Sequence, residues 1–269
     1  MTNLMISSRN YADAAVLTAV SGSFVSTLPL ANLQDPRLSV VARADTGYFQ
    51  ILADLGSAKP VRVVALAGHT FSKLSSITVA AGNTLPLGSY SYVLGGTYCW
   101  LEMPDEEMAE YTGLALRIAD GTPYQYWRVG IGDPLNFNTH VDIGRLWIGD
   151  GWQPGDERGI AYGCKWAYDD PSTSVVSRGG AEYFDLRPKQ RVLTISHDAL
   201  TKAEGMDGVL GLQRRIGKSG QALVVFDPDE TGPDLIRLSM LCRRTGNDGL
   251  TWINPVDWGG SEEFREVVG

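Results

Sequence analysis

Hydrophobic residues along the chain fall into short runs that are separated by turn-forming residues such as glycine, proline and aspartate. Two of these runs, residues 49–55 and 61–67, lie on either side of a turn-like sequence at residues 56–60. Both have the apolar character of buried strands. No segment of helical period separates the strands of the first half, so the pattern predicts a jelly roll or another β-sandwich. Further strands are expected at residues 76–80, 90–94, 114–118, 126–131 and 141–148.

A segment dense in glycine and charged residues, 149–159, separates two halves of the chain that differ in pattern. With 269 residues, the chain is longer than one ordinary hydrophobic core requires. We therefore expect two domains, residues 1–150 and residues 151–269, that meet in this segment. Trp147 and Trp152 lie in and beside it, which indicates a packed connector.

The second half combines short strands with one helix. Residues 174–186 have the pattern of a β-hairpin, with two apolar strands around a glycine-containing turn. Thr201 and Glu204 have the spacing of a capping box, which predicts a helix over residues 201–216. The predicted fold class is therefore all-β dominated, with an N-terminal jelly roll or sandwich and a C-terminal β-rich domain that contains one embedded helix. Strands of the second half are also expected at residues 191–196, 221–226 and 235–242.

Composition and charge narrow the class of partner. The formal net charge is −8 and no basic tract offsets it, which argues against nucleic acid and anionic lipid as partners. No apolar run approaches the roughly 20 residues that span a bilayer, and the start of the chain lacks a signal-peptide pattern, so we expect a cytosolic product. Cys99, Cys164 and Cys242 are widely separated, and we expect all three thiols to be reduced.

Two motifs that bind phosphate or calcium are incomplete in this chain. Residues 217–219, Gly-Lys-Ser, lack the earlier glycine of a phosphate loop, and we expect them to end a helix. Asp227, Asp229 and Gly232 match three positions of a calcium loop. The twelfth position is Leu238 instead of glutamate, so a solvated loop between strands is expected there.

Catalytic constellations are also missing. His69, His140 and His197 share no metal-binding spacing. Residues 196–198 are Ser-His-Asp, but adjacent side chains cannot line up as nucleophile, base and orienting acid. The carboxylates within residues 102–110 have the pattern of a solvated acidic face. We assign no catalytic, cofactor-binding or metal-binding residue and expect no enzyme.

Two phrases in the first half point to a family. Residues 28–39 are LPLANLQDPRLS, and residues 53–66 are ADLGSAKPVRVVAL. Together they resemble a module of tailed-phage and prophage tail proteins, a discoidin-type or galactose-binding-like jelly roll. Residues 126–131 and 141–149 are similar to the paired closing strands of that fold. The resemblance covers residues 1 to about 150 and implies a virion protein with a jelly-roll module.

The second half is similar to the strand, hairpin, helix and strand arrangement of tail-tube and distal-tail proteins. The resemblance implies a structural component of a phage tail tip or baseplate, assembled in the host cytoplasm with tube, hub, tape-measure or fibre proteins. It also implies a homo-oligomeric ring with three-fold or six-fold symmetry. Iron–sulfur tail-hub proteins have four cysteines near their end, and this chain has no such group, which counts against that role.

A ring needs two different complementary patches on each copy. We expect them at the hairpin of residues 174–186 and at the acidic loop of residues 227–234, because a hairpin edge can extend a neighbouring sheet and carboxylates can meet arginines. The alternative is that both segments are solvated turns. The candidate interface residues are Arg178, Tyr183, Arg187, Arg214, Arg215, Asp227 and Asp229.

The alternative function is a carbohydrate-binding module that recognises a host surface glycan. Tryptophan and tyrosine offer large, stiff, amphipathic surfaces on which sugar rings can stack. Trp100 and Trp127 are the candidate sugar contacts, and burial in the core is the competing interpretation for both.

Overall fold

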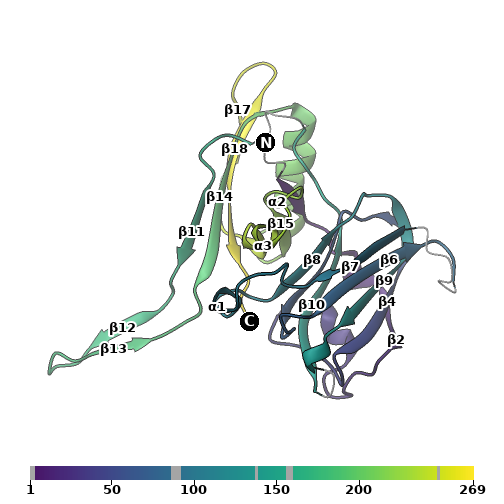
Figure 1. Ribbon diagram of the computed structural model, residues 1–269. Coiled ribbons are helices and arrows are strands. Elements are labelled where there is room, and N and C mark those ends of the chain that lie inside the picture. The colour runs from purple at the N-terminus through teal and green to yellow at the C-terminus, as the bar shows by residue number, and fades with distance from the viewer. Residues whose placement is uncertain (1–3, 86–91, 137–138, 156–159, 247–248) are drawn as a thin grey trace. The chain divides into compact units, whose positions relative to one another are not determined.

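The computed structural model describes residues 4–85, 92–136, 139–155, 160–246 and 249–269. The chain forms two compact units, which we describe separately (Figure 1). The sandwich unit comprises Thr2–Gln153 and Ala222–Met240, with Gly269. The arm unit comprises Pro154–Gln221 and Leu241–Val268, with Met1. Parts of the expected connector, residues 156–159, and of the strand expected at 90–94, residues 90 and 91, lie outside the described residues.

The sandwich unit is built from two antiparallel sheets (Figure 1). One sheet has five strands in the order β2-β4-β9-β6-β7, and the other has four in the order β3-β10-β5-β8. The strands of the first are β2 (Val16–Ser21), β4 (Tyr48–Pro60), β9 (Pro123–Gly132), β6 (Ser76–Gly82) and β7 (Tyr92–Tyr98). Those of the second are β3 (Ala42–Ala44), β10 (Val141–Gly149), β5 (Val63–His69) and β8 (Leu114–Ile118).

One hydrophobic core lies between these sheets. Phe49 and Ile51 of β4 alternate inward, while Leu66 of β5 and Ile143 of β10 enter the same core from the other sheet. Alternation on β4 is the expected pattern for a strand with one face on the core and one face in solvent. The first half is therefore an antiparallel β-sandwich, as the strand pattern predicts.

Strand β4 runs through the turn that the sequence predicts at residues 56–60. The register with β9 shifts between Asp54 and Lys59, so the extra residues form a bulge and the strand resumes. Gly56 has φ +74°, and its N–H donates to Asp54 Oδ1 at 2.8 Å. A local glycine turn thus becomes a bulge because both flanking parts pair with the same neighbouring strand.

Residues 222–240 belong to the sandwich unit, whereas the sequence analysis placed them in the second domain. Strand β15 (Ala222–Val225) pairs with β1 (Met5–Ser7), at the other end of the chain. Nonlocal pairing of this kind leaves no mark in the sequence near either strand.

The same segment contains a helix where the sequence predicts the start of a strand at 235–242. Helix α3 (Pro233–Arg237) precedes β16 (Ser239–Arg244). Pro233 occupies the first turn, where its missing N–H costs nothing. Arg237 donates from Nη2 to Glu107 Oε2 at 2.7 Å, which ties α3 to helix α1 (Asp105–Met108). The segment thus forms one short helix before the strand, with a local start signal at Pro233 and a long-range contact at Arg237.

The arm unit contains an antiparallel sheet of its own, in which residues 241–244 of β16 lie beside β18, followed by β14 and β11. Strand β17 also pairs with β18. The bounds are β18 (Trp258–Glu266), β14 (Gln190–Leu200), β11 (Lys165–Asp169) and β17 (Leu250–Trp252).

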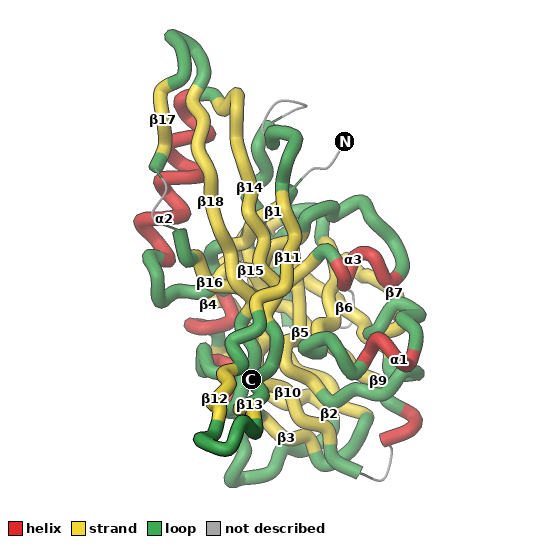
Figure 2. The backbone as a smooth tube through the Cα atoms, turned by 90° about the vertical axis from the view of Figure 1, so that its left-hand side faces the viewer, coloured by secondary structure: helices red, strands yellow, loops and turns green. Residues whose placement is uncertain are grey.

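A helix lies along this sheet, as Figures 1 and 2 show. It consists of a π-helical segment (Glu204–Val209) and α2 (Leu210–Ile216), close to the bounds expected from the sequence. The predicted capping box is present: Glu204 N–H donates to Thr201 Oγ1 at 3.3 Å, and Thr201 N–H donates to Glu204 Oε2 at 2.8 Å. The all-β class with an embedded helix is thus the class that the structure has.

Candidate functional site

A long hairpin of the arm unit exposes apolar side chains on both faces. Strands β12 (Thr173–Val176) and β13 (Glu182–Asp185) form a separate two-stranded sheet that extends beyond β11 and β14 (Figure 1). We call residues 173–186 the arm. Pro171 and Pro188 interrupt the two strands at its base, where proline cannot donate a ladder hydrogen bond.

Pairing along the arm decides which side chains share a face. Val175 pairs with Tyr183 on one face, while Val176 and Phe184 lie on the other. These four side chains are 61–68% exposed, and Leu186 at the base is 81% exposed. A two-stranded ribbon with no apolar neighbour is marginally stable by itself, so such a surface is typical of a segment that contacts a partner.

The tip of the arm is a defined turn. Gly180 has φ +84° and donates its N–H to Ser177 O at 2.9 Å, while Ala181 N–H donates to Ser177 Oγ at 3.1 Å. Because glycine adopts positive φ without a Cβ clash, this position closes the hairpin that the sequence predicts.

The predicted interface residues fall in three places. Arg178, Tyr183 and Arg187 are exposed on or beside the arm, and Arg187 Nη2 lies 3.0 Å from Asp185 Oδ2. Arg214 and Arg215 are exposed on α2 of the same unit.

Asp227 and Asp229 lie in the sandwich unit, in the loop after β15. Asp229 N–H donates to Asp227 Oδ1 at 3.2 Å, so the loop is organised by its own hydrogen bonds. The structure therefore brings the arm residues together and leaves the acidic loop in the other unit.

Four exposed apolar residues of the arm are not among the interface residues predicted from the sequence: Val175, Val176, Phe184 and Leu186. A signal was available, because the two strands carry apolar residues at successive positions instead of alternating with polar ones. Strands buried on both faces have the same pattern, so exposure was decided only by the absence of a neighbour along this part of the described chain.

Trp100 and Trp127 are not surface residues, which corrects their assignment as sugar contacts. Trp100 is 4% exposed and donates from Nε1 to Phe71 O at 2.9 Å. Trp127 is fully buried and donates from Nε1 to Tyr124 O at 3.2 Å. Both indoles satisfy their one polar group inside the sandwich core, so neither presents a ring face to a ligand.

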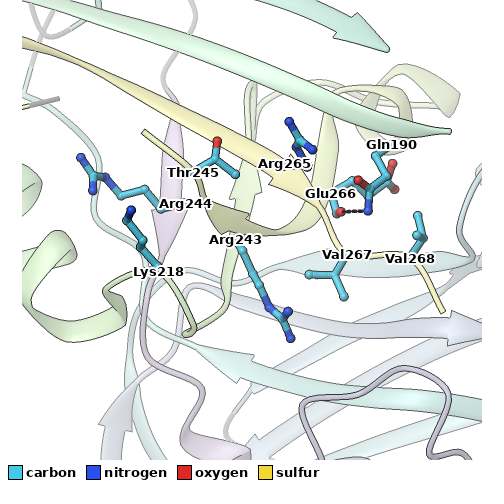
Figure 3. Close-up of a pocket in the computed structure, with 9 residues that line it drawn as sticks. All are labelled: Gln190, Lys218, Arg243, Arg244, Thr245, Arg265, Glu266, Val267 and Val268. Carbon is cyan, nitrogen blue, oxygen red and sulfur yellow. Dashed lines mark hydrogen bonds between the residues drawn. The ribbon is translucent and has the colours of Figure 1, made fainter. Parts of the chain in front are cut away.

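A cavity of about 240 Å³ opens in the arm unit among β16, β18 and the turn after α2 (Figure 3). Arg243 and Arg265 are directly paired across β16 and β18, an arrangement of like charges that destabilises a sheet unless the charges separate. Figure 3 shows their guanidinium groups pointing away from each other. Four cationic side chains line the cavity: Lys218, Arg243, Arg244 and Arg265.

Carboxylates of the same unit compensate part of this charge. Glu266 lies in the cavity wall, and its Oε1 is 2.6 Å from Arg191 Nη2, with the two side chains 6% and 4% exposed. Arg265 Nη1 lies 2.9 Å from Asp169 Oδ2. Among the described residues, Lys218 and Arg243 are the lining cations without a carboxylate partner. Chemically, the cavity can contact an anionic group, and it contains no arranged nucleophile and base.

Three buried ionisable side chains lie close together on strands of the arm-unit sheet. Glu262 is fully buried, with Oε2 3.8 Å from His197 Nε2 and Oε1 3.8 Å from Arg244 Nε. All three come from different strands, β18, β14 and β16. Because the carboxylate has no exposed surface, a substrate in solvent cannot reach it, and the group is structural.

The titratable residues of the sandwich core are also unsuited to catalysis. Burial lowers the pKa of His69 to about 3, and burial raises the pKa of the Cys99 thiol to about 12. His69 Nδ1 accepts from the Phe71 N–H at 3.2 Å, and its ring stacks on Phe71. A neutral imidazole and a protonated thiol, both enclosed, supply neither a nucleophile nor an accessible base at neutral pH.

The described part of the chain has neither a metal-binding cluster nor a membrane-spanning helix. There, no group of three or more histidine, cysteine, aspartate or glutamate residues is placed to hold a metal ion. Within the same residues, no helix has the length and apolar character needed to cross a membrane.

Comparison with known proteins finds likeness only to solved structures. No family model matches the chain, and no curated protein matches it. The lectin domain of lectinolysin complexed with Lewis b antigen is 12% identical, with a TM-score of 0.40 over 53% of this chain and 96% of that domain.

Two further structures are similar over the same share of the chain. A fucose-binding module of Streptococcus pneumoniae is 12% identical, with a TM-score of 0.37 over 53% of this chain and 95% of the module. A chitosan-binding module from a chitosanase/glucanase of Paenibacillus sp. IK-5 is 16% identical, with a TM-score of 0.40 over 53% of this chain and 99% of the module. At these values we base neither the fold nor the function on the likeness.

Proposed function

We propose that this protein is a structural component of a larger assembly and binds its neighbours through the arm. One observation carries the proposal: large apolar side chains are exposed on both faces of a hairpin that extends beyond its own sheet. The more specific identity, a tail tip or baseplate protein of a tailed phage, rests on the sequence phrases at residues 28–39 and 53–66. That identity gives the protein a place in the virion, assembly in the host cytoplasm and a three-fold or six-fold ring.

The energetics favour a partner for the arm. Fully burying a large apolar side chain contributes about 1.5–3 kcal/mol, and roughly two thirds of each of the five side chains is still exposed, so covering them contributes on the order of 5–10 kcal/mol before the cost of association. An isolated hairpin gains none of this in water. An arm with two apolar faces fits a partner that contacts it from both sides, such as a neighbouring copy and a second tail protein.

Substitution of the arm tests the proposal. We expect Phe184→Ser combined with Leu186→Ser to leave the folded chain intact but to reduce its incorporation into particles at least tenfold, because the lost apolar contacts are worth several kcal/mol. Incorporation is measured by quantitative mass spectrometry of purified virions, and circular dichroism checks folding.

Tyr162→Ser is the matched control, since Tyr162 is 99% exposed and lies outside the arm. A cryo-EM map of the particle then gives the copy arrangement. Absence of the wild-type chain from particles contradicts the phage-tail identity. Normal incorporation of the double variant contradicts the role of the arm.

A second candidate function is carbohydrate binding by the sandwich unit, with a host surface glycan as ligand. Two exposed tyrosines of its five-stranded sheet, Tyr48 on β4 and Tyr98 on β7, support this candidate. The solved structures named above are described as binding Lewis b antigen, fucose or chitosan. A glycan array probed with the full chain tests the candidate, and absence of binding to any glycan contradicts it.

A further inference from the structure

Two exposed tyrosines lie at the ends of one row across the five-stranded sheet. Tyr48 of β4 pairs with Gly132 of β9, and Gly132 pairs with Ser76 of β6. Ser76 pairs in turn with Tyr98 of β7. Directly paired residues of antiparallel strands have side chains on the same face, so these four positions form a continuous row. Each tyrosine is 45% exposed, which places the row on the solvent side.

The neighbouring row, one residue further along each strand, shows that the tyrosine row lies on the outer face of the sheet. Phe49, Ile131 and Ile77 follow or precede the row by one residue and are paired with one another. All three are buried in the sandwich core. Because side chains alternate between the faces of a strand, the tyrosine row points away from that core.

Between the tyrosines, the surface is a low floor of glycine backbone and hydroxyl groups. A Cβ added at Gly132 would lie 3.4 Å from Tyr48 Cε1, so the Tyr48 ring leans over this glycine. Ser76 Oγ donates to Gly132 O at 3.3 Å, which keeps the hydroxyl close to the sheet. The Tyr48 ring thus covers the glycine, and Ser76 lies between this ring and Tyr98 along the row.

The next row on the same face is also small and polar. It consists of Gln50, Gly130 and Thr78, paired across β4, β9 and β6. Thr78 Oγ1 donates to Gly130 O at 3.3 Å. A Cβ added at Gly130 would lie 3.5 Å from Gln50 Cγ, so the Gln50 side chain extends over this glycine on the same face. Neither of these two rows contains a charged side chain, and we call them together the uncharged strip. The strip ends at the following row, which contains Arg128.

The size of the strip decides between a protein and a small ligand. The tyrosine row crosses three strand spacings, about 14 Å, and successive rows on one face are about 7 Å apart. The uncharged strip therefore covers on the order of 100–200 Å², far below the roughly 800 Å² that each partner buries in a stable protein interface. A short chain molecule that can stack on two rings and bond hydroxyl and amide groups fits this area.

We propose that the strip formed by Tyr48, Gln50, Gly132, Ser76, Thr78 and Tyr98 is a binding site for a short, neutral oligosaccharide. The assignment rests on the carbohydrate-binding candidate above and names its site and ligand class. Sugar rings at the two ends stack on Tyr48 and Tyr98, because aromatic faces pack against the apolar C–H side of a pyranose. The hydroxyl groups between them bond the Gln50 amide and the Thr78 hydroxyl. An uncharged site on a chain of net charge −8 disfavours acidic glycans.

The test uses the full chain on a glycan array, followed by calorimetric titration with the neutral glycan that binds best and with its terminal monosaccharide. Because the rings are separated, affinity rises from the monosaccharide to the oligosaccharide in the wild type. Tyr98→Ala removes that rise and lowers oligosaccharide affinity roughly tenfold, while Tyr48→Ala combined with Tyr98→Ala abolishes measurable binding.

Tyr162→Ala is the control, because this exposed tyrosine belongs to the arm unit, and it leaves binding unchanged. Thermal unfolding of each variant checks that the sheet is intact. If no glycan binds the wild type, both the carbohydrate-binding candidate and this site are wrong. If glycans bind and the double tyrosine variant binds equally well, the function stands and the site is wrong. If the double tyrosine variant is no longer incorporated into particles but binds glycans as the wild type does, the strip is a protein interface. That result also overturns the proposed oligosaccharide site.

Discussion

His69 shows how burial sets the chemistry of a single residue. The imidazole is stacked on Phe71 at 4.2 Å between ring centroids and contacts the edge of Trp100. In this environment the charged form loses its hydration, which lowers the pKa of His69 from 6.5 to about 3. Asp133 lies close enough to favour the cation, but burial is the larger effect.

The depressed pKa predicts acid sensitivity. The unfolded chain takes up a proton at His69 below about pH 6.5, whereas the folded chain does so only near pH 3, so the free energy of unfolding falls as the pH drops through this window. We expect His69→Gln to remove this contribution, with the wild type losing up to about 1.4 kcal/mol per pH unit relative to the variant. Urea unfolding of both proteins between pH 7.5 and 4.5 measures the difference. Parallel pH profiles for the two would contradict the prediction.

At the scale of elements, local signals and tertiary contacts compete. The capping box of Thr201 and Glu204 forms because both partners lie within one turn. Helix α3 forms in place of the expected strand, with Pro233 in its first turn, and its Arg237 bonds Glu107, a residue 130 positions away in sequence. The first kind of contact can be predicted from spacing, and the second cannot.

The capping box predicts a measurable loss of stability. Thr201→Ala removes the acceptor of the Glu204 N–H, and we expect it to lower the free energy of unfolding by about 1 kcal/mol. Ser219→Ala, in the exposed turn after the same helix, serves as control and is expected to change stability by less than about 0.5 kcal/mol. Urea denaturation followed by circular dichroism compares the two. Equal effects of both substitutions would show that the box adds nothing to the native helix.

At the scale of the whole molecule, the three thiols differ in burial. Cys99 lies in the sandwich core and Cys242 in the buried part of β16, whereas Cys164 is partly exposed before β11. None of the three cysteines is in a disulfide bond, as the sequence predicts. We expect one fast-reacting thiol per native chain and three after denaturation, because burial excludes the reagent and raises the pKa of Cys99.

Titration with a chromogenic disulfide reagent, without reductant, checks this distribution. Cys164→Ser is the matched variant and should remove the fast phase while leaving two thiols in the denatured chain. Two or more fast thiols in the native wild type would show that Cys99 or Cys242 becomes accessible in solution.

The approximate places of strands β4 to β10, the hairpin at 174–186 and the helix after Thr201 follow from the sequence alone, because hydrophobic period, turn residues and capping spacing are local. Strands β1, β2 and β3 were not predicted. The place of residues 222–240 in the sandwich unit, the bulge in β4 and the burial of Trp100 and Trp127 were decided by contacts between segments far apart in the chain. The candidate sites depend on the same nonlocal pairing. Tyr48 and Tyr98 become ends of one row only through the register of four strands, and the arm is exposed only because no other described strand covers it.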